Sequence, residues 1–372
     1  MQNKFYNDIQ GNFGFGCMRF PMKNGEVDRE ATAAMVDEFI NAGFNYFDTA
    51  HGYLEEQSEK VLRKVLVERY PRESYILVNK LSNDYFKKQE DIRPFFEKQL
   101  EICGVTYFDF YLMHAQTASI YKKYKKCNAY ETAFELKQEG KVKHVGLSFH
   151  DKADVLEGIL NDYPEIEVVQ LQFNYVDYND TGIEARKCYE VCEKYQKPVI
   201  VMEPVKGGSL VNLPKEAQAI FDELQNGSSA SYAIRFAASF DNIMMVLSGM
   251  SNMEQMVDNI SYMKDFKPLS EEEFAAIWKV CDIFKSQDLI PCTACKYCVP
   301  GCPKKISIPD LFADMNALNT FQTWNSRWYY SIHTKNSGKA SDCIKCGKCE
   351  AACPQHLPIR ELLEKVADTF DK

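Results

Sequence analysis

Two runs of cysteines near the carboxyl end of the chain share the spacing C-x2-C-x2-C-x3-C, and a proline follows the fourth cysteine of each run. The eight cysteines are Cys292, Cys295, Cys298, Cys302, Cys343, Cys346, Cys349 and Cys353. Three thiolates on one tight loop fit three corners of a [4Fe-4S] cube, and the fourth cysteine of such a run ligates the other cluster. The spacing therefore predicts two [4Fe-4S] clusters and a protein that moves electrons.

This crossed ligation gives each cluster three cysteines from one run and one from the other. Cys353 completes the cluster of the first run, and Cys302 completes that of the second. A pair of structural zinc sites is the alternative, because four thiolates also suit tetrahedral zinc. Zinc sites usually combine two cysteine pairs, whereas a three-plus-one run before proline resembles the bacterial ferredoxins. About forty residues separate the runs, so we expect residues 291–372 to form a mainly helical, ferredoxin-like two-cluster domain.

The composition of the chain restricts its partners and its compartment. The formal net charge is -9 over 372 residues, and no block of basic residues is present, which argues against nucleic-acid or membrane partners. The other six cysteines are scattered without framework spacing, as expected in a reducing compartment. No apolar run approaches the ~18 residues that a membrane span needs, and no apolar targeting segment opens the chain. We expect a soluble, cytoplasmic protein.

Short β-rich segments alternate with amphipathic helical segments in the first two thirds of the chain. The eight candidate strands cover residues 13–17, 44–48, 75–79, 109–113, 143–147, 168–172, 199–203 and 243–247. This alternation predicts parallel strands joined by crossover helices, and eight such units fit an α/β fold, the (β/α)8 TIM barrel. A doubly wound sheet also alternates, but no G-x-G-x-x-G opens the first helix. We expect the barrel over residues 1–266 and a connecting helix over 267–290.

Polar side chains capable of acid-base chemistry follow three consecutive predicted strands. Asp48, Lys80 and His114 stand at the strand ends, and Tyr53 lies in the loop after Asp48. Each suits a helix cap or a solvated loop when taken singly, but reactive residues of TIM barrels occupy these positions, so together they predict a catalytic constellation. A phenol with a pKa near ~10 donates a proton poorly at neutral pH unless an ammonium stabilises the phenolate. We therefore expect Lys80, held by Asp48, to lower the pKa of Tyr53.

The same residues lie in segments that resemble the aldo-keto reductase family over roughly residues 12–264. The matching segments are Phe47-Asp48-Thr49-Ala50-His51-Gly52-Tyr53, Ser58-Glu59, Lys80 at the end of a strand, His114 after FYLM, and Gly146-Leu147-Ser148. The resemblance implies reduction of a small-molecule carbonyl substrate. It assigns Tyr53 as general acid, Lys80 and Asp48 as the pair that tunes it, and His114 as the group that orients the carbonyl.

The resemblance also implies a bound nicotinamide cofactor. The candidate cofactor-binding residues are Ser148, Gln170, Met202, Gly207, Gly208, Ser248, Gly249, Ser251, Asn252, Gln255, Asp258 and Asn259. Ser148 and Gln170 match the pair that holds the nicotinamide carboxamide, and Asp258 and Asn259 match the adenine contacts. Met202 replaces the aromatic residue that stacks on the nicotinamide ring.

The phosphate contacts of the cofactor depart from the family pattern. Gly249 and Gln255 stand where the family places cations against the 2'-phosphate, and a phosphate dianion without Lys or Arg is poorly held. Among NAD(P)H cofactors, NAD(H) is therefore favoured. Backbone N–H groups of Gly207-Gly208 and of residues 248–252 suit a phosphate of NAD or FMN, although turn geometry alone also accounts for these glycines.

Nicotinamide transfers a hydride, whereas a [4Fe-4S] cluster passes one electron at a time, so three functions remain open. The leading one is an aldo-keto reductase whose clusters link it to a cellular electron carrier such as ferredoxin. The second is a flavin-dependent electron-transfer enzyme on the same barrel with ferredoxin as partner, because FMN handles both one and two electrons. The third is a non-enzymatic redox-sensing or nucleotide-binding module, against which the intact Tyr53 and Lys80 argue.

Overall fold

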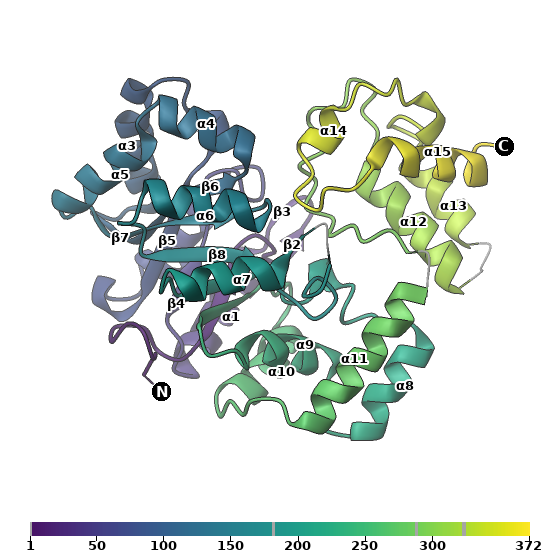
Figure 1. Ribbon diagram of the computed structural model, residues 1–372, viewed down its shortest axis with the longest axis horizontal. Coiled ribbons are helices and arrows are strands. Elements are labelled where there is room, and N and C mark those ends of the chain that lie inside the picture. Colours follow the sequence, from purple (N-terminus) through teal and green to yellow (C-terminus); the bar gives the residue numbers. More distant parts are fainter. Residues whose placement is uncertain (1, 181–182, 287–288, 322–324) are drawn as a thin grey trace. The chain divides into compact units, whose positions relative to one another are not determined.

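The structure, a computed structural model, describes residues 2–180, 183–286, 289–321 and 325–372 (Figure 1). The chain forms two compact units. The barrel unit comprises residues 1–204 and 230–270, and the C-terminal unit comprises residues 205–229 and 271–372. The segment 205–229, which follows a barrel strand, thus joins the C-terminal unit, although the sequence placed the barrel boundary at residue 266. No described helix combines the length and apolar character that crossing a membrane requires.

Eight parallel strands close the barrel. They are β1 (Phe13–Gly16), β4 (Tyr46–Asp48), β5 (Ile76–Leu81), β6 (Phe108–Gln116), β7 (Val142–Phe149), β8 (Val168–Gln172), β9 (Val199–Met202) and β10 (Ile243–Ser248). Each strand pairs with the next one along the chain, and β10 returns to β1 with Phe13 opposite Val246. The TIM barrel expected from the alternating segments is confirmed. A two-stranded hairpin of β2 (Met22–Lys23) and β3 (Glu26–Val27) was not expected.

Both faces of the barrel strands are buried, one toward the helices and one toward the barrel interior, so the strands are rich in apolar side chains. Tyr46, Val78 and Phe110 belong to one buried cluster inside the ring of strands. Residues before β1 are fixed to the barrel by Asn3, whose amide donates to the carbonyl oxygens of Gly11 and Met244 at 2.7 and 2.8 Å. The interior is a packed core, so chemistry is left to the strand ends.

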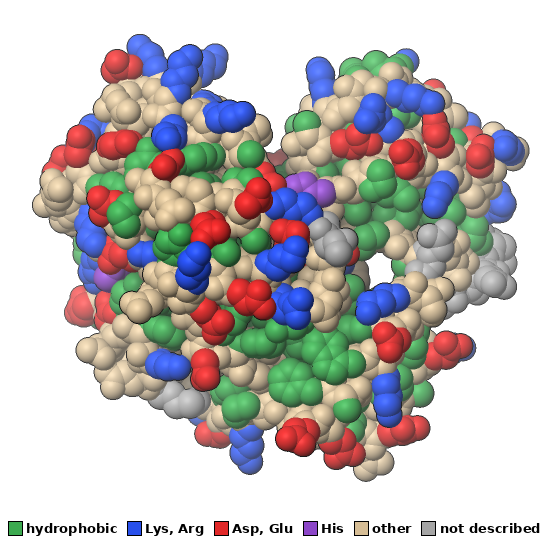
Figure 2. Space-filling model, in the orientation of Figure 1, with side chains coloured by type: hydrophobic (Ala, Val, Ile, Leu, Met, Phe, Trp, Pro, Cys, Tyr) green, Lys and Arg blue, Asp and Glu red, His purple; other side chains and the backbone are tan. Residues whose placement is uncertain are grey.

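Helices surround the strands of the barrel unit (Figure 1). They are α1 (Arg29–Asn41), α2 (Ser58–Leu62), α3 (Ile92–Cys103), α4 (Ala118–Lys126), α5 (Ala129–Gln138), α6 (Ala153–Asp162), α7 (Ala185–Lys194), α9 (Ser229–Ala238) and α10 (Met253–Met263). Acidic and basic side chains are interspersed over the face of α6 and α7 (Figure 2), where Lys194 pairs with Glu157 at 2.5 Å.

The C-terminal unit is helical, as expected from the sequence. Its helices are α8 (Lys215–Leu224), α11 (Glu271–Ser286), α12 (Ile308–Phe321), α13 (Asn325–His333), α14 (Lys348–Ala351) and α15 (Ile359–Phe370). Helix α11 lies within residues 267–290, where the sequence predicted a connecting helix, and it belongs to the C-terminal unit. Residues 287–288 of that segment lie outside the described part. Ile308, Leu311 and Leu363 form a core between α12 and α15, and the cysteine loops pack against this core.

The turn after β9 packs tightly within the C-terminal unit. Gly207 has φ +64°, and a Cβ atom at this position would lie 2.4 Å from the carbonyl oxygen of Thr293, the residue after Cys292. Any side chain here meets backbone that is itself fixed by the cysteine loop. The glycine is therefore required both for its left-handed conformation and for the close approach of the two chain segments.

Gly207→Ala is expected to lower the free energy of unfolding of the C-terminal unit by at least about 2 kcal/mol, from the left-handed backbone and the overpacking together. Gly158→Ala is the matched control, because Gly158 lies inside α6 with nothing within 4 Å of its Cβ position. Alanine at 158 should raise stability by roughly 0.5–1 kcal/mol. Urea unfolding followed by circular dichroism and visible absorbance measures both, and an unchanged midpoint for Gly207→Ala would contradict the packing.

Candidate functional site

The ammonium group of Lys80 organises the carboxyl ends of β4 and β5. Its three N–H donors meet three acceptors: Asp48 Oδ1 at 2.5 Å, the carbonyl oxygen of Thr49 at 2.9 Å and the hydroxyl oxygen of Tyr53 at 3.2 Å. Lys80 and Asp48 are buried, at 0% and 3% exposure. An ammonium has three donors and no acceptor, so these contacts use its full capacity. The structure thus brings together three of the four residues that the sequence singled out, around one buried cation.

A buried polar network holds the backbone of Lys80, and sequence reasoning did not anticipate it. The Lys80 amide donates to Asn79 Oδ1 at 2.8 Å, and its carbonyl oxygen accepts from Gln99 Nε2 at 3.1 Å. Both amide side chains also donate to Glu59 Oε1, while His51 contacts the other oxygen of Glu59 at 2.5 Å. The positions of His51 and Glu59 in the family-like segments were the available signal. The network fixes the strand that carries the ammonium.

Tyr53 differs from expectation in its acidity. Burial raises the pKa of the phenol well above its usual value of 10, and the charge of Asp48 raises it further. The sequence predicted the opposite shift, caused by Lys80. Desolvation of the phenolate dominates instead, and Asp48 at 2.5 Å offsets much of the positive charge of Lys80. In the free protein, Tyr53 therefore keeps its proton at neutral pH.

His114 lies near Tyr53, at 6.1 Å between ring centroids and 75° between ring planes. Burial lowers the pKa of His114 well below 6.5, and the neighbouring charges of Lys80 and His150 lower it further. The imidazole is therefore neutral over the physiological range. Its Nδ1 atom contacts the hydroxyl of Ser82 at 2.6 Å, which fixes the orientation of the ring.

The residues expected at the nicotinamide occupy neighbouring strand ends. Ser148 and Gln170 are paired across β7 and β8. Gln170 donates to Asp48 Oδ2 at 3.1 Å, which links it to the Lys80 cluster, and Ser148 Oγ accepts from the backbone amide of Ala115 at 2.7 Å. Met202 ends β9 and is half-buried. These predicted contacts are thus tied to the same strand ends as Tyr53 and His114.

The predicted adenine and phosphate segment surrounds the start of α10. Asn252 caps this helix, and Gln255 Oε1 accepts from the amide of Ser251 at 2.8 Å, so both side chains stabilise the turn. Asn259 donates to Ser248 Oγ at 2.8 Å, and Asp258 beside it is half-buried.

Sequence reasoning missed one cation near this segment. The side chain of Arg19 lies against Gly249, where an added Cβ atom would be 3.2 Å from Arg19 Cδ. The carbonyl oxygen of Arg19 accepts a hydrogen bond from Ser251 Oγ at 2.9 Å. The signal was weak, because Arg19 follows β1 and is distant in sequence from Gly249. Gly207 and Gly208, expected at the same phosphate, belong to the C-terminal unit, where Gly207 packs against Thr293.

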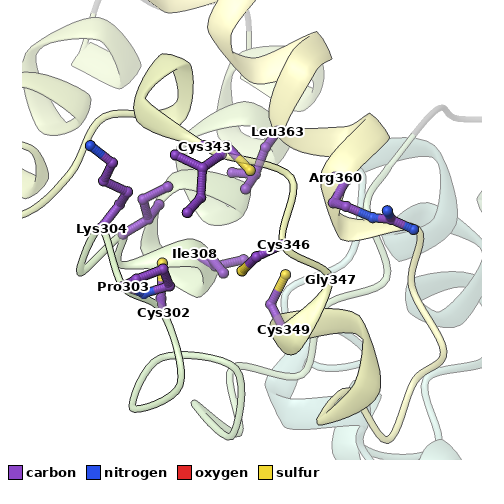
Figure 3. Close-up of a pocket in the computed structure, with 12 residues that line it drawn as sticks. Cys302, Pro303, Lys304, Ile308, Cys343, Cys346, Gly347, Cys349, Arg360 and Leu363 are labelled. Carbon is purple, nitrogen blue, oxygen red and sulfur yellow. The ribbon is translucent and has the colours of Figure 1, made fainter.

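The eight cysteines surround two cavities of the C-terminal unit. One cavity is lined by Cys302 together with Cys343, Cys346 and Cys349 (Figure 3). The other is lined by Cys353 together with Cys292, Cys295 and Cys298. Each cavity thus receives three cysteines of one run and the fourth of the other, which is the arrangement that two cubane clusters need. Within the described residues, no group of three or more His, Cys, Asp or Glu side chains is placed to hold a metal ion.

The two cysteine loops have the same backbone geometry. A residue in the left-handed region stands directly before and after the middle cysteine of each loop: Ala294 and Lys296 at φ +53° and +64°, and Lys345 and Gly347 at +57° and +75°. Left-handed residues curl the chain, and backbone turns of this kind can form concavities whose N–H groups bind anions or iron-sulfur clusters. The donor set and the loop geometry both fit iron-sulfur clusters.

The thiol of Cys298 in the second cavity is harder to ionise than a free thiol. Burial and the nearby Cys295, Cys292 and Cys353 raise the pKa of Cys298 to about 12. The iron of a cluster would favour its thiolate form, because a metal ion stabilises the charge of the thiolate that binds it.

Comparison with known proteins identifies both parts of the chain. Residues 12–282 match the aldo/keto reductase family. The chain belongs to this family. Residues 291–357 match the 4Fe-4S dicluster domain, so an iron-sulfur domain follows the reductase domain. Both resemblances predicted from the sequence are confirmed, and the protein is an oxidoreductase.

Several relatives share the barrel. The NADH-specific methylglyoxal reductase of Escherichia coli is 23% identical over 281 residues, which cover 65% of this chain and 85% of that protein. The holo form of aldo-keto reductase AKR11C1 from Bacillus halodurans has a TM-score of 0.62 at 23% identity and covers 75% of this chain and 95% of its own. An aldo-keto reductase from Klebsiella pneumoniae in complex with NADPH has a TM-score of 0.60 at 20% identity and covers 72% and 90%. The structural matches show the fold, and nothing in them supports FMN.

The anaerobically purified protein is expected to contain about eight iron atoms and eight acid-labile sulfides per chain. Cys302→Ser and Cys353→Ser should each lose about four of each, because each removes the crossed ligand of one cluster. Cys281→Ser is the control, since this buried cysteine lies in neither run. Metal and sulfide analysis of the four proteins provides the measurement. About two zinc atoms per chain without sulfide would refute the cluster assignment.

Proposed function

We propose that the barrel reduces a small carbonyl compound with a nicotinamide dinucleotide, and that the eight cysteines hold two [4Fe-4S] clusters that exchange electrons with a cellular carrier. One observation carries the reductase part: Lys80, Asp48 and Tyr53 are joined by hydrogen bonds at the ends of adjacent strands. The nicotinamide supplies a hydride, and the clusters supply one-electron transfer. The side chains of this protein must position the substrate and deliver a proton.

Tyr53 is the proposed proton donor. Lys80 donates to the phenolic oxygen, and this direction leaves the hydroxyl hydrogen of Tyr53 free to point at a substrate oxygen. The raised pKa keeps the proton in place until negative charge develops on the carbonyl oxygen. A developing alkoxide is a far stronger base than a carbonyl, so transfer occurs when the substrate is reduced. The ammonium of Lys80 then stabilises the phenolate that remains.

His114 is the proposed positioning group for the carbonyl. It is neutral, so it carries one N–H donor. In the proposed arrangement the Ser82 hydroxyl, 2.6 Å from Nδ1, is the donor of that hydrogen bond, and the imidazole proton is on Nε2. An Nε2–H donor beside Tyr53 gives the substrate oxygen a second hydrogen bond. Two donors at one oxygen fix its place and stabilise its charge, as in an oxyanion hole.

Ser148 and Gln170 are the proposed contacts of the nicotinamide carboxamide. Their pairing across β7 and β8 places them on adjacent strands at the same level of the barrel. The bond from Gln170 to Asp48 couples this contact to the Lys80 cluster. A carboxamide held here would therefore lie close to the residues that receive the substrate.

Tyr53→Phe is expected to lower kcat for carbonyl reduction by roughly 10²- to 10⁴-fold, because it removes the proton donor and keeps the ring. Tyr85→Phe is the matched control, since the hydroxyl of Tyr85 bonds to Glu56. Rates are measured with the best substrate from a panel of aldehydes, ketones and 2-oxoaldehydes. Nucleotide affinity and visible absorbance should be unchanged in both variants, and full activity of Tyr53→Phe would remove the proposed role.

NADH is expected to bind more tightly than NADPH, because the amide of Gln255 is engaged by Ser251 and Gly249 offers no cation. Fluorescence titration of the purified protein with each nucleotide gives both dissociation constants. The proposal would be contradicted if NADPH bound more than about tenfold more tightly than NADH, a difference of about 1.4 kcal/mol in binding free energy. Titration of Arg19→Met then shows whether Arg19 supplies the phosphate contact, because only the NADPH affinity would fall.

A further inference from the structure

The two cysteine cavities have different surroundings. The cavity that contains Cys353 is also lined by Thr293 and Gln355. Gly207 packs against Thr293, and the buried Lys206 donates to Gln355 Oε1 at 3.2 Å. This cavity is thus built onto the segment that continues the chain directly from β9.

The cavity that contains Cys302 has the more exposed middle cysteine, because Cys295 of the other loop is half-buried. Its Cys346 is exposed, and the adjacent Ile344 is 56% exposed, which is unusual for a large apolar side chain. In Figure 3 the sulfur atoms of Cys346 and Cys349 face the same space from one loop, with Cys302 on the opposite segment. A cluster held here would have one ligand at the protein surface beside an apolar side chain.

Cationic side chains surround this exposed cavity. Lys304 and Arg360 line it on two sides, and no acidic side chain lines it (Figure 3). Lys348 is exposed next to Cys349. Arg360 pairs with Glu350 at 2.7 Å, whereas Lys304 and Lys348 make no ion pair within the described part of the chain. Lys345, which precedes Cys346, pairs with Glu364, so the uncompensated positive charge near this cavity is that of Lys304 and Lys348, in a chain whose net charge is -9.

We propose that the surface formed by Cys346, Ile344, Lys304, Lys348 and Arg360 is the docking site for a small acidic protein that carries one electron at a time. The proposal rests on the proposed function, because it requires clusters at the cysteines. The reduced carrier gives up one electron, and the cluster gains it; no bond forms or breaks, and no proton moves.

The charge and the exposed ligand select this partner. Electron-transfer complexes are small and short-lived, and charge complementarity steers their association. An acidic carrier meets the unpaired lysines, and the apolar side chain of Ile344 supplies a dry contact next to the thiolate. Lys296 also lines the other cavity, but Cys295, the middle cysteine of its loop, is half-buried, so the carrier is expected to address the cluster of Cys346 first.

The test uses the holoprotein and, as probe, a purified bacterial ferredoxin of strongly negative net charge. Lys304→Glu/Lys348→Glu is compared with the wild type and with Lys98→Glu/Lys264→Glu, a matched reversal of two exposed lysines on the barrel unit. Calorimetry gives the dissociation constant at low and high salt, and stopped-flow absorbance gives the rate of cluster reduction by the reduced probe.

The double reversal at 304 and 348 should weaken binding and slow cluster reduction by at least tenfold at low salt, and high salt should abolish the difference. The barrel control should change either value by less than twofold, and dithionite should reduce the clusters of all three proteins equally. Unchanged binding in the Lys304 and Lys348 variant, or an equal loss in the barrel control, would overturn the docking site. Iron content is measured first: absence of clusters refutes the proposed function, whereas intact clusters without a docking effect refute this inference alone.

Discussion

The barrel site depends on one buried cation. Lys80 has no exposed surface, and a charge that is removed from water is stable only when its donors are satisfied and an anion lies close. Asp48, the Thr49 carbonyl and Tyr53 meet both conditions at 2.5, 2.9 and 3.2 Å. Because all three donors are used, the position of Lys80 also fixes that of the Tyr53 oxygen. Removal of Asp48 alone would leave an uncompensated buried charge.

The acidity of the site follows from the same burial. Desolvation raises the pKa of Tyr53 and lowers that of His114, so in the free protein both side chains are neutral. A neutral phenol and a neutral imidazole offer two hydrogen-bond donors. Because neither is negatively charged, neither neutralises the positive charge of Lys80. The ammonium of Lys80 can therefore stabilise the negative charge that develops on the substrate or on Tyr53 during the reaction.

The C-terminal unit is held together by a different constraint. Two crossed sets of cysteines converge on cavities that lie against one small apolar core of Ile308, Leu311 and Leu363. Clusters would tie the two runs together twice, since each cube would bind both. The segment 205–229 from the barrel portion of the sequence joins this unit, and its Gly207 contacts the first cysteine loop. The turn after β9 therefore packs against the first cysteine loop.

The order of the strands, the barrel fold and the chemical groups at the strand ends could all be predicted from the amino-acid sequence. Strand alternation and strand-end polarity are local patterns, so the amino-acid sequence alone was enough to recognise Asp48, Lys80 and His114, together with the eight regularly spaced cysteines. The pKa of Tyr53 could not be predicted from the sequence, because desolvation depends on residues that are distant in the chain. The expected direction of the pKa shift was wrong. The network of Glu59, Asn79 and Gln99 behind Lys80 and the contact between Arg19 and Gly249 likewise exist only after folding. Spacing predicts which groups are available, whereas the tertiary structure alone decides their burial, their partners and therefore their charge.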